Sequence, residues 1–390
     1  MKAETMETVS EDEIIFKKLL FRGHEQLNEK GFLLNLIHRD CEKVITDPDS
    51  GVHVMVPPIP VASDVKRRGI NWEHAPIQPR SQYVPLRRHV AVEFILPEGE
   101  KKEIQRGQIP TPAEQALEAI VECVNKEILS SYTQVYNFVG SPGMTPFSND
   151  AGTKILPEIH CLLQKQKCLP GNRYFIGNPC TEQAAKSLGA FRSISWASAS
   201  QGLQKGQVNF GFGFKFYADH QVPFHKAGGA KGKRVRNRLS EGAEEMEIHQ
   251  GSGNPVIGDI FTIEGQTQTY VVREIGLPDK ENSATERNKK TATLAFAPKL
   301  TVAVAENTAL DFKDSHRVNL AFHRDAICFV SRLARDPCWN CKTLSHSDLP
   351  RDFITYLVQV NRGHELPRYG YILLFGVLVM RPELICRVAG

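Results

Sequence analysis

One long helical pattern constrains the fold of this chain more than any other feature. Across residues 111–140, apolar side chains recur at spacings of three and four, which places them on one face of a helix. Thr111 fits the cap, Pro112 fits the first helical position, and Glu114 completes a capping box. Gly140 and the Ser-Pro-Gly after it end the pattern. We therefore predict a single helix about 40 Å long, along which other elements must pack.

The composition provides enough apolar residues for a large core. The 390 residues are 41% hydrophobic, and a chain of this length forms about two to four domains. Because 48 basic residues nearly balance 44 acidic ones, the net charge is only +4. The whole chain therefore does not behave as a polycation, and any affinity for nucleic acid has to come from a local patch.

Cysteine usage and hydropathy indicate the cellular compartment in which the chain is expected. Its nine cysteines are an odd number scattered along the sequence, which favours reduced thiols in a reducing compartment. The N-terminal segment is acidic where a signal peptide needs basic residues and an apolar run. The most apolar window, 371–380, lies between arginines and is too short for a membrane helix of about 20 residues. We expect a buried strand or short core helix there, and a protein that is soluble and intracellular where it is made.

The remaining segments predict a mixture of strands and helices. Residues 51–105 are β-rich but broken by prolines and carry many basic residues, which favours a long, twisted, solvent-exposed hairpin. A helix is expected near 150–168, and strands at 172–176 and 208–217.

A change in charge and texture marks a separate block. Basic residues gather in 226–238 and glutamates in 241–247, which is typical of a mobile surface loop. Short apolar strands separated by polar turns follow in 256–304, with strands expected at 256–263, 269–272, 291–296 and 300–304. We therefore predict a small β-barrel inserted into a host domain.

Motifs for known chemistry are incomplete. The His-Arg-Asp triplets at 38–40 and 323–325 lack the asparagine that a kinase loop places five residues after the aspartate. The glycine-rich run 228–234 lacks the first glycine of a phosphate-binding loop. The sequence contains neither a metalloprotease helix motif nor a nucleophile elbow. We therefore expect no enzyme and no cofactor.

Two weaker patterns are compatible with binding. Cys338, Cys341 and His346 have the spacing of metal ligands, but a structural zinc site needs four, so two ordinary thiols are favoured. The basic stretch 226–238 lacks interleaved aromatic residues for base stacking and is followed by acids, so a solvated loop is favoured over a nucleic-acid site. Its candidate phosphate contacts are Lys231, Lys233, Arg234, Arg236 and Arg238.

Five segments in order resemble the major capsid (coat) proteins of tailed bacteriophages, in the branch with an inserted β-barrel domain. These segments are 136–146 (YNFVGSPGMTP), 171–179 (GNRYFIGNP), 258–263 (GDIFTI), 318–326 (VNLAFHRDA) and 375–390, which contains FGV, RPEL and CRVAG. Each is weakly specific alone, and their order carries the resemblance. A nucleic-acid-binding protein using 226–238 is the alternative, and an unrecognised enzyme comes third.

The resemblance implies an α+β fold, the tailed-phage capsid fold with an inserted small β-barrel. The implied parts are an N-terminal arm (1–50), an extended loop (51–108), a peripheral domain (109–170) with the spine helix (111–140), an axial or central domain (171–225), an inserted β-rich domain (226–316) and a return to the central and peripheral sheet (317–390).

The same resemblance implies self-assembly into an icosahedral shell that encloses a double-stranded DNA genome. The implied partners are many copies of the chain in pentamers and hexamers, a scaffolding protein, a portal, a decoration protein and packaged DNA held non-specifically, with no membrane. The location would be the virion, after assembly in the host cytoplasm. The residues with expected structural or assembly roles are Thr111, Pro112, Glu114, Ile120, Gly140, Arg381, Pro382 and Glu383.

Overall fold

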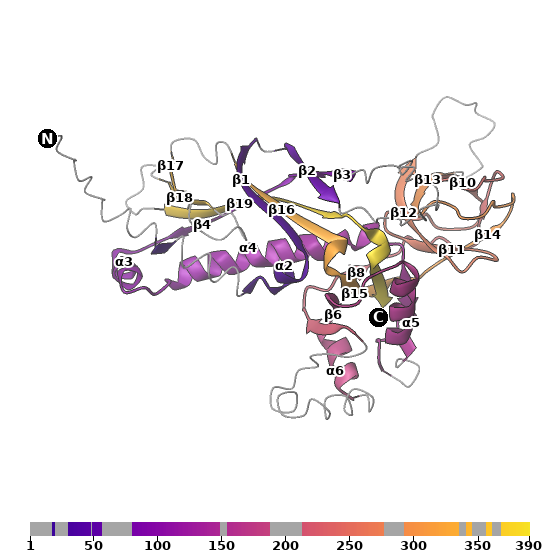
Figure 1. Cartoon of the computed structure of the whole chain (residues 1–390), viewed down its shortest axis with the longest axis horizontal. Helices are drawn as coiled ribbons and strands as arrows, with labels where there is room; N and C mark the ends of the chain where they lie inside the picture. The colour runs from indigo at the N-terminus through magenta and orange to yellow at the C-terminus, as the bar shows by residue number, and fades with distance from the viewer. Residues whose placement is uncertain are drawn as a thin grey trace, which may run out of the picture. The chain divides into compact units, whose positions relative to one another are not determined.

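The computed structural model describes most of the chain as two compact units of mixed α and β structure (Figure 1). The first unit comprises 1–124 and 328–380, and the second comprises 125–327 and 381–390. The described residues are 18–19, 30–47, 49–56, 80–148, 154–187, 213–276, 292–334, 341–344, 356–360 and 368–390.

A six-stranded sheet forms the centre of the first unit. Its order is β1 (His38–Thr46), β16 (Ile327–Ala334), β19 (Arg368–Val379), β18 (Tyr356–Val360) and β17 (Cys341–Leu344), and β4 (Arg88–Ile95) also pairs with β19. Short α2 (Phe32–Leu36) precedes β1. The apolar window at 371–380 lies almost entirely within β19, where Leu373, Leu374 and Phe375 are fully buried. Strands buried on both faces read as continuous apolar runs, so the expected buried strand is confirmed.

The predicted hairpin is present where the structure describes it. Strands β2 (Gly51–Val56) and β3 (Arg80–Pro85) pair antiparallel from Gly51 opposite Pro85 to Val56 opposite Arg80. One face buries Val54 and Val84 in the core formed with β16 and β19. Residues 57–79 lie outside the described part.

Residues 88–105, which the sequence places in the same extended hairpin, form a sheet strand and a helix instead. Strand β4 pairs with β19 from Ile95 opposite Arg368 to Arg88 opposite Phe375, and α3 (Glu98–Gln105) follows it. The alternation of apolar residues suits β4 to pair in the sheet beside β19. The interpretation based on prolines overlooked this alternation.

The long helix is shorter than expected. Helix α4 (Thr111–Ser130) is followed by the 3-10 turn η1 (Ser131–Gln134) and by β5 (Phe138–Gly140), so the prediction of one helix over 111–140 is wrong beyond Ser130. The Ser131 hydroxyl donates to the Ile128 carbonyl at 2.6 Å, and such local bonds favour a tightened helix end. The apolar residues after Ser130 keep the spacing of a helix, but they lie in other structure: the turn η1, the connection after it and strand β5.

The apolar face of α4 is buried as predicted. Its buried side chains are Ala113, Ala116, Leu117, Ile120, Val121, Val124, Ile128 and Leu129. On the more exposed side, Lys30 Nζ lies 2.8 Å from Glu114 Oε1 and 2.6 Å from Glu118 Oε1. At 1.5 Å per residue, the helix is about 30 Å long.

A second sheet forms the base of the second unit. Its order is β5, β20 (Ile385–Ala389), β15 (His316–His323), β6 (Arg173–Gly177) and β7 (Lys215–Ala218), and β8 (Phe224–His225) also pairs with β15. Helices α5 (Ile155–Lys165) and α6 (Pro179–Ser187) precede and follow β6. The helix expected near 150–168 and the strand expected at 172–176 are confirmed. Strand β7 coincides with the end of the strand expected at 208–217. Residues 208–212 of that expected strand lie outside the described part.

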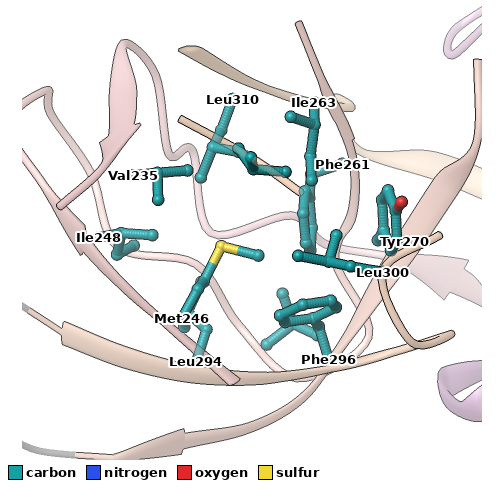
Figure 2. Close-up of a cluster of buried hydrophobic side chains, with 12 residues drawn as sticks. Val235, Met246, Ile248, Phe261, Ile263, Tyr270, Leu294, Phe296, Leu300 and Leu310 are labelled. Carbon is teal, nitrogen blue, oxygen red and sulfur yellow. The ribbon is translucent and has the colours of Figure 1, made fainter. Parts of the chain in front are cut away.

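The predicted small barrel is confirmed as a closed six-stranded barrel in the second unit (Figure 1). Its order is β10 (Glu245–His249), β13 (Ala292–Ala297), β12 (Thr269–Gly276), β11 (Ile260–Ile263), β14 (Ala309–Phe312) and β9 (Lys233–Val235). Figure 2 shows Phe261, Tyr270 and Phe296 converging with Met246 and Leu294 on the interior. Inward-facing side chains fill a barrel this small.

Two expectations about the barrel are wrong. Residues 226–247 are not one mobile surface loop, because they supply β9 and begin β10. Their charges conceal a strand alternation in which Val235 and Ile248 face the core. Residues 300–304 form no strand: they bury Leu300 and Val304, and the last barrel strand is β14.

Candidate assembly elements and the barrel junction

The barrel joins the second sheet through two connections that run side by side. Opposite ends of the insertion meet where His225 of β8 pairs with His316 of β15. Beyond this pair, the Ala227 amide donates to Ser315 Oγ at 2.9 Å. We call residues 224–228 and 313–317 the neck of the barrel.

Asp259 ties the neck to the barrel. This carboxylate is buried in the turn before β11, and its Oδ1 lies 2.8 Å from His225 Nε2. Its Oδ2 accepts from the amides of Gly228, at 3.2 Å, and Val256, at 2.9 Å. Three donors therefore satisfy a carboxylate that would be costly to bury alone.

A short hydrogen-bond chain continues from Asp259 to the end of the long helix. Because His225 Nε2 donates to Asp259, its Nδ1 accepts from the Tyr132 hydroxyl of η1, 3.2 Å away. Burial raises the pKa of the Tyr132 phenol, so the hydroxyl stays protonated at neutral pH. The Asp-His-Tyr chain therefore connects the turn before β11, the neck and the end of the long helix.

Arg387 of β20 completes this junction. Its side chain is 0% exposed, Nη1 donates to the Gly258 carbonyl at 2.8 Å, and the guanidinium carbon lies 4.9 Å from the centre of the Tyr132 ring. Burial lowers the pKa of Arg387 to about 9, which leaves it charged at neutral pH. Asp259 and the Tyr132 ring stabilise the charge.

Further contacts fix the segment after the helix between the barrel and β20. Thr269 Oγ1 of the barrel donates to the Tyr136 carbonyl at 2.7 Å. Asn137 Nδ2 donates to the Ile385 carbonyl at 2.8 Å. Tyr136 also packs with Ile260 and Val271 in a small apolar cluster. Sequence reasoning missed this junction, although the segments that carry the resemblance contain Gly258, Asp259 and Arg387.

Several of the predicted structural residues lie at such joints. Gly140 has a φ of +94°, and a Cβ there would meet the Ala389 carbonyl at 3.0 Å, so glycine suits the contact between β5 and β20. Arg381 Nε lies 3.0 Å from Glu383 Oε1, and Pro382 begins the turn η4 (Pro382–Leu384) before β20.

The start of the long helix differs slightly from the expectation. Thr111 is the first helical residue, and Pro112 is the second. The Glu114 amide donates to the Pro110 carbonyl at 3.0 Å, while the Glu114 carboxylate pairs with Lys30. Ile120 lies at the centre of the buried face, with no exposed surface.

The basic residues of 226–238 lie in different environments. Lys233 is 2% exposed, and Arg236 Nη1 lies 3.3 Å from Glu247 Oε2. Arg234 donates to the Asn307 carbonyl at 2.7 Å, Lys231 lies 3.8 Å from Asp314, and Arg238 is exposed. Burial of Lys233 and these partners leave fewer basic groups free for phosphates, so the nucleic-acid alternative is not supported.

The candidate metal site lies mostly outside the described residues. Cys338 and His346 lie outside them, and Cys341 is the first residue of β17. Within the described ranges, no group of three or more His, Cys, Asp or Glu side chains could hold a metal ion. The free cysteines in those ranges are Cys123, Cys161, Cys168, Cys180, Cys328 and Cys386.

No helix in the part of the chain that the structure describes has the length and hydropathy required to cross a membrane. No protein-family model matches the chain. No curated protein matches it.

Solved structures of viral and virus-like particles do resemble the chain. The cyanophage P-SCSP1u capsid structure is 7% identical, with a TM-score of 0.43 over 91% of this chain and 86% of the other. The mature capsid of bacteriophage PhiM1 is 8% identical, with a TM-score of 0.41 over 90% and 85%. The virus-like particle from Pyrococcus furiosus is 9% identical, with a TM-score of 0.41 over 96% and 97%.

Proposed function

We propose that this chain is the major capsid protein of a tailed bacteriophage and assembles into an icosahedral shell around double-stranded DNA. One observation supports this function above the others. The segments that carry the capsid resemblance are far apart in sequence, yet their strands are neighbours in one sheet, in the order β5, β20, β15 and β6. The segment 258–263 joins them, because Arg387 of β20 donates to Gly258. The resemblance therefore concerns one connected structural centre.

The hairpin of β2 and β3 supplies a surface suited to a neighbouring copy. While Val54 and Val84 are buried, Met55 is 57% exposed and Tyr83 is 50% exposed on the other face. The His53 ring lies 5.5 Å from the Tyr83 ring. Exposed apolar side chains such as Met55 and Tyr83 are typical of a surface that another subunit covers.

The balance of charge suits a protein that contains nucleic acid without reading its sequence. The net charge is only +4, and Lys231, Arg234 and Arg236 near β9 have partners within the chain. We therefore propose that packaged DNA is held non-specifically inside the shell. Pentamers and hexamers of the chain, a scaffolding protein, a portal and a decoration protein complete the proposed set of partners, with assembly in the host cytoplasm and the virion as destination.

Electron microscopy and mass measurement of the purified full chain test this function. We expect shells, or rings of capsomer size, because many weak contacts reinforce one another in a closed assembly. A chain that stays monomeric at high concentration, alone and with its neighbouring gene products, would contradict the proposal.

A hairpin variant makes the test specific. Met55→Asp combined with Tyr83→Asp places charges on an exposed face, so the subunit should fold while shell formation is lost. Size-exclusion chromatography and circular dichroism measure the two properties separately. The matched variant Met55→Leu with Tyr83→Phe keeps the face apolar and should assemble. Normal shells from the aspartate variant would show that no neighbouring copy covers this face.

A further inference from the structure

The neck of the barrel contains a histidine, His316, whose side chain takes no part in the hydrogen bonds described above. His316 is 1% exposed and pairs across the neck with His225, whose ring lies 5.5 Å away. The Phe138 ring packs edge-on against it at 5.1 Å. His316 Nδ1 lies 2.8 Å from the Asp314 carbonyl and therefore carries the proton that it donates there.

A second proton on His316 has to go to Nε2, and nothing there receives it. Among the described residues, His316 Nε2 has no hydrogen-bond partner, and neither do Nε and Nη2 of Arg387. Protonation would therefore place another buried donor in a region that already has two donors without acceptors. It would also place a second positive charge near the guanidinium.

The groups that act on this site come from every element packed around it. Arg387 of β20 and His225 of β8 oppose a positive charge on His316, and Asp259, before β11, favours one. Tyr132 of η1 and Arg273 of β12 act on Arg387. Asp259 is the one carboxylate in this set, and it already accepts three hydrogen bonds.

We propose that the neck is an acid-sensitive latch. With His316 neutral, the latch holds the barrel against η1 and β20 through Asp259, Tyr132 and Arg387. When His316 takes up a proton, the neck loosens and the barrel is released from these contacts. The latch is a property of the fold and does not depend on shell assembly.

The direction of the pH dependence follows from the burial of His316. Burial, which has the largest effect, and then Arg387 and His225 lower its pKa from 6.5 to about 4. The hydrogen bond to the Asp314 carbonyl, which has the second-largest effect, and Asp259 oppose this shift. A released His316 would titrate near 6.5, so the released form binds more protons between the two values. The latch therefore stabilises the closed form fully above pH 6.5, and this stabilisation is lost as the pH falls toward 4.

Amide hydrogen exchange of the full chain tests the latch. Exchange times at pH 7 and pH 4.5 are scaled to the intrinsic chemical rate, and peptides covering 132–140 and 256–276 are compared with peptides from β6. For pKa values of about 4 and 6.5, opening at the barrel should rise by roughly fifty-fold between these pH values. Peptides from β6 should change much less.

Two variants assign the response to His316. His316→Gln keeps a donor for the Asp314 carbonyl and cannot titrate, so its barrel peptides should show a pH response at least tenfold smaller than those of the wild type. His316→Phe preserves the ring packing and provides a second non-titrating variant if the glutamine variant does not fold. His220→Gln changes an exposed histidine and should behave like the wild type.

The outcomes separate the latch from general acid sensitivity. Barrel protection that is unchanged between the two pH values would overturn the proposal. An equal loss of protection in the wild type and both His316 variants would also overturn it, because the proton would then act elsewhere.

Discussion

The contacts at the barrel junction depend on the backbone conformation of single residues as much as on charge. Gly258 presents its carbonyl to Arg387 and has a φ of +92°, a conformation that L side chains rarely adopt. A Cβ there would lie 3.2 Å from Thr133 Cγ2 and 3.4 Å from His225. The absence of a side chain therefore allows β11 to approach η1 and the neck.

We expect Gly258→Ala to lower the free energy of unfolding by about 1–3 kcal/mol of backbone strain, with crowding against Thr133 adding to it. Gly265→Ala is the matched control, because Gly265 has a φ of +81° but open space around its position. Denaturant unfolding of the two variants separates the shared strain from the crowding. Adding Thr133→Ser to Gly258→Ala should restore part of the loss, since it removes the crowded methyl group. Equal effects at both glycines would mean that the approach to η1 contributes nothing.

Among the elements, α4 has the clearest relation between sequence and burial. Ile120 is fully buried, whereas the adjacent Ala119 is exposed. The same chemical change at these neighbouring positions therefore tests which face of the helix is packed.

Ile120→Asp should cost about 4 kcal/mol or more, because it buries an unpaired charge. The yield of soluble subunit and the denaturant midpoint measure this loss. Ala119→Asp introduces the same charge on the exposed side and should leave both near the wild-type values. A well-folded Ile120→Asp subunit would be incompatible with a buried helix face.

For the whole molecule, affinity for DNA depends more on where the charged side chains lie than on the net charge. Lys231 and Arg238 are exposed basic residues near β9, but the basic side chains between them are buried or bonded within the chain. A dispersed set of charges releases few counterions on contact with DNA.

Replacing Lys231 and Arg238, by Lys231→Gln and Arg238→Gln, should therefore leave DNA retention by assembled particles unchanged. Retention measured across a salt series should also keep the same slope. A markedly weaker slope in the double variant would indicate that these residues bind phosphates, and would favour the nucleic-acid interpretation of the basic stretch.

Local patterns predicted those elements whose burial repeats along the chain. The apolar run of β19 and the face of α4 required no knowledge of distant residues. Strand alternation in the barrel was visible in 256–296, but the charges of 226–247 concealed β9 and β10. The end of α4 was missed because Val135, Tyr136 and Val139 keep a helical spacing, although the first two lie between η1 and β5 and the third lies in β5.

The sequence by itself determined the long amphipathic helix, the buried central strand and the inserted barrel, because each follows from a short period of apolar residues. Only the tertiary structure decided where the helix stops and how the barrel is attached. Tyr132, His225, Asp259, His316 and Arg387 come from five separate segments, and no local period connects them. These residues interact because buried polar groups need hydrogen-bond partners. Their partners are distant in the sequence and become neighbours only when the chain has folded.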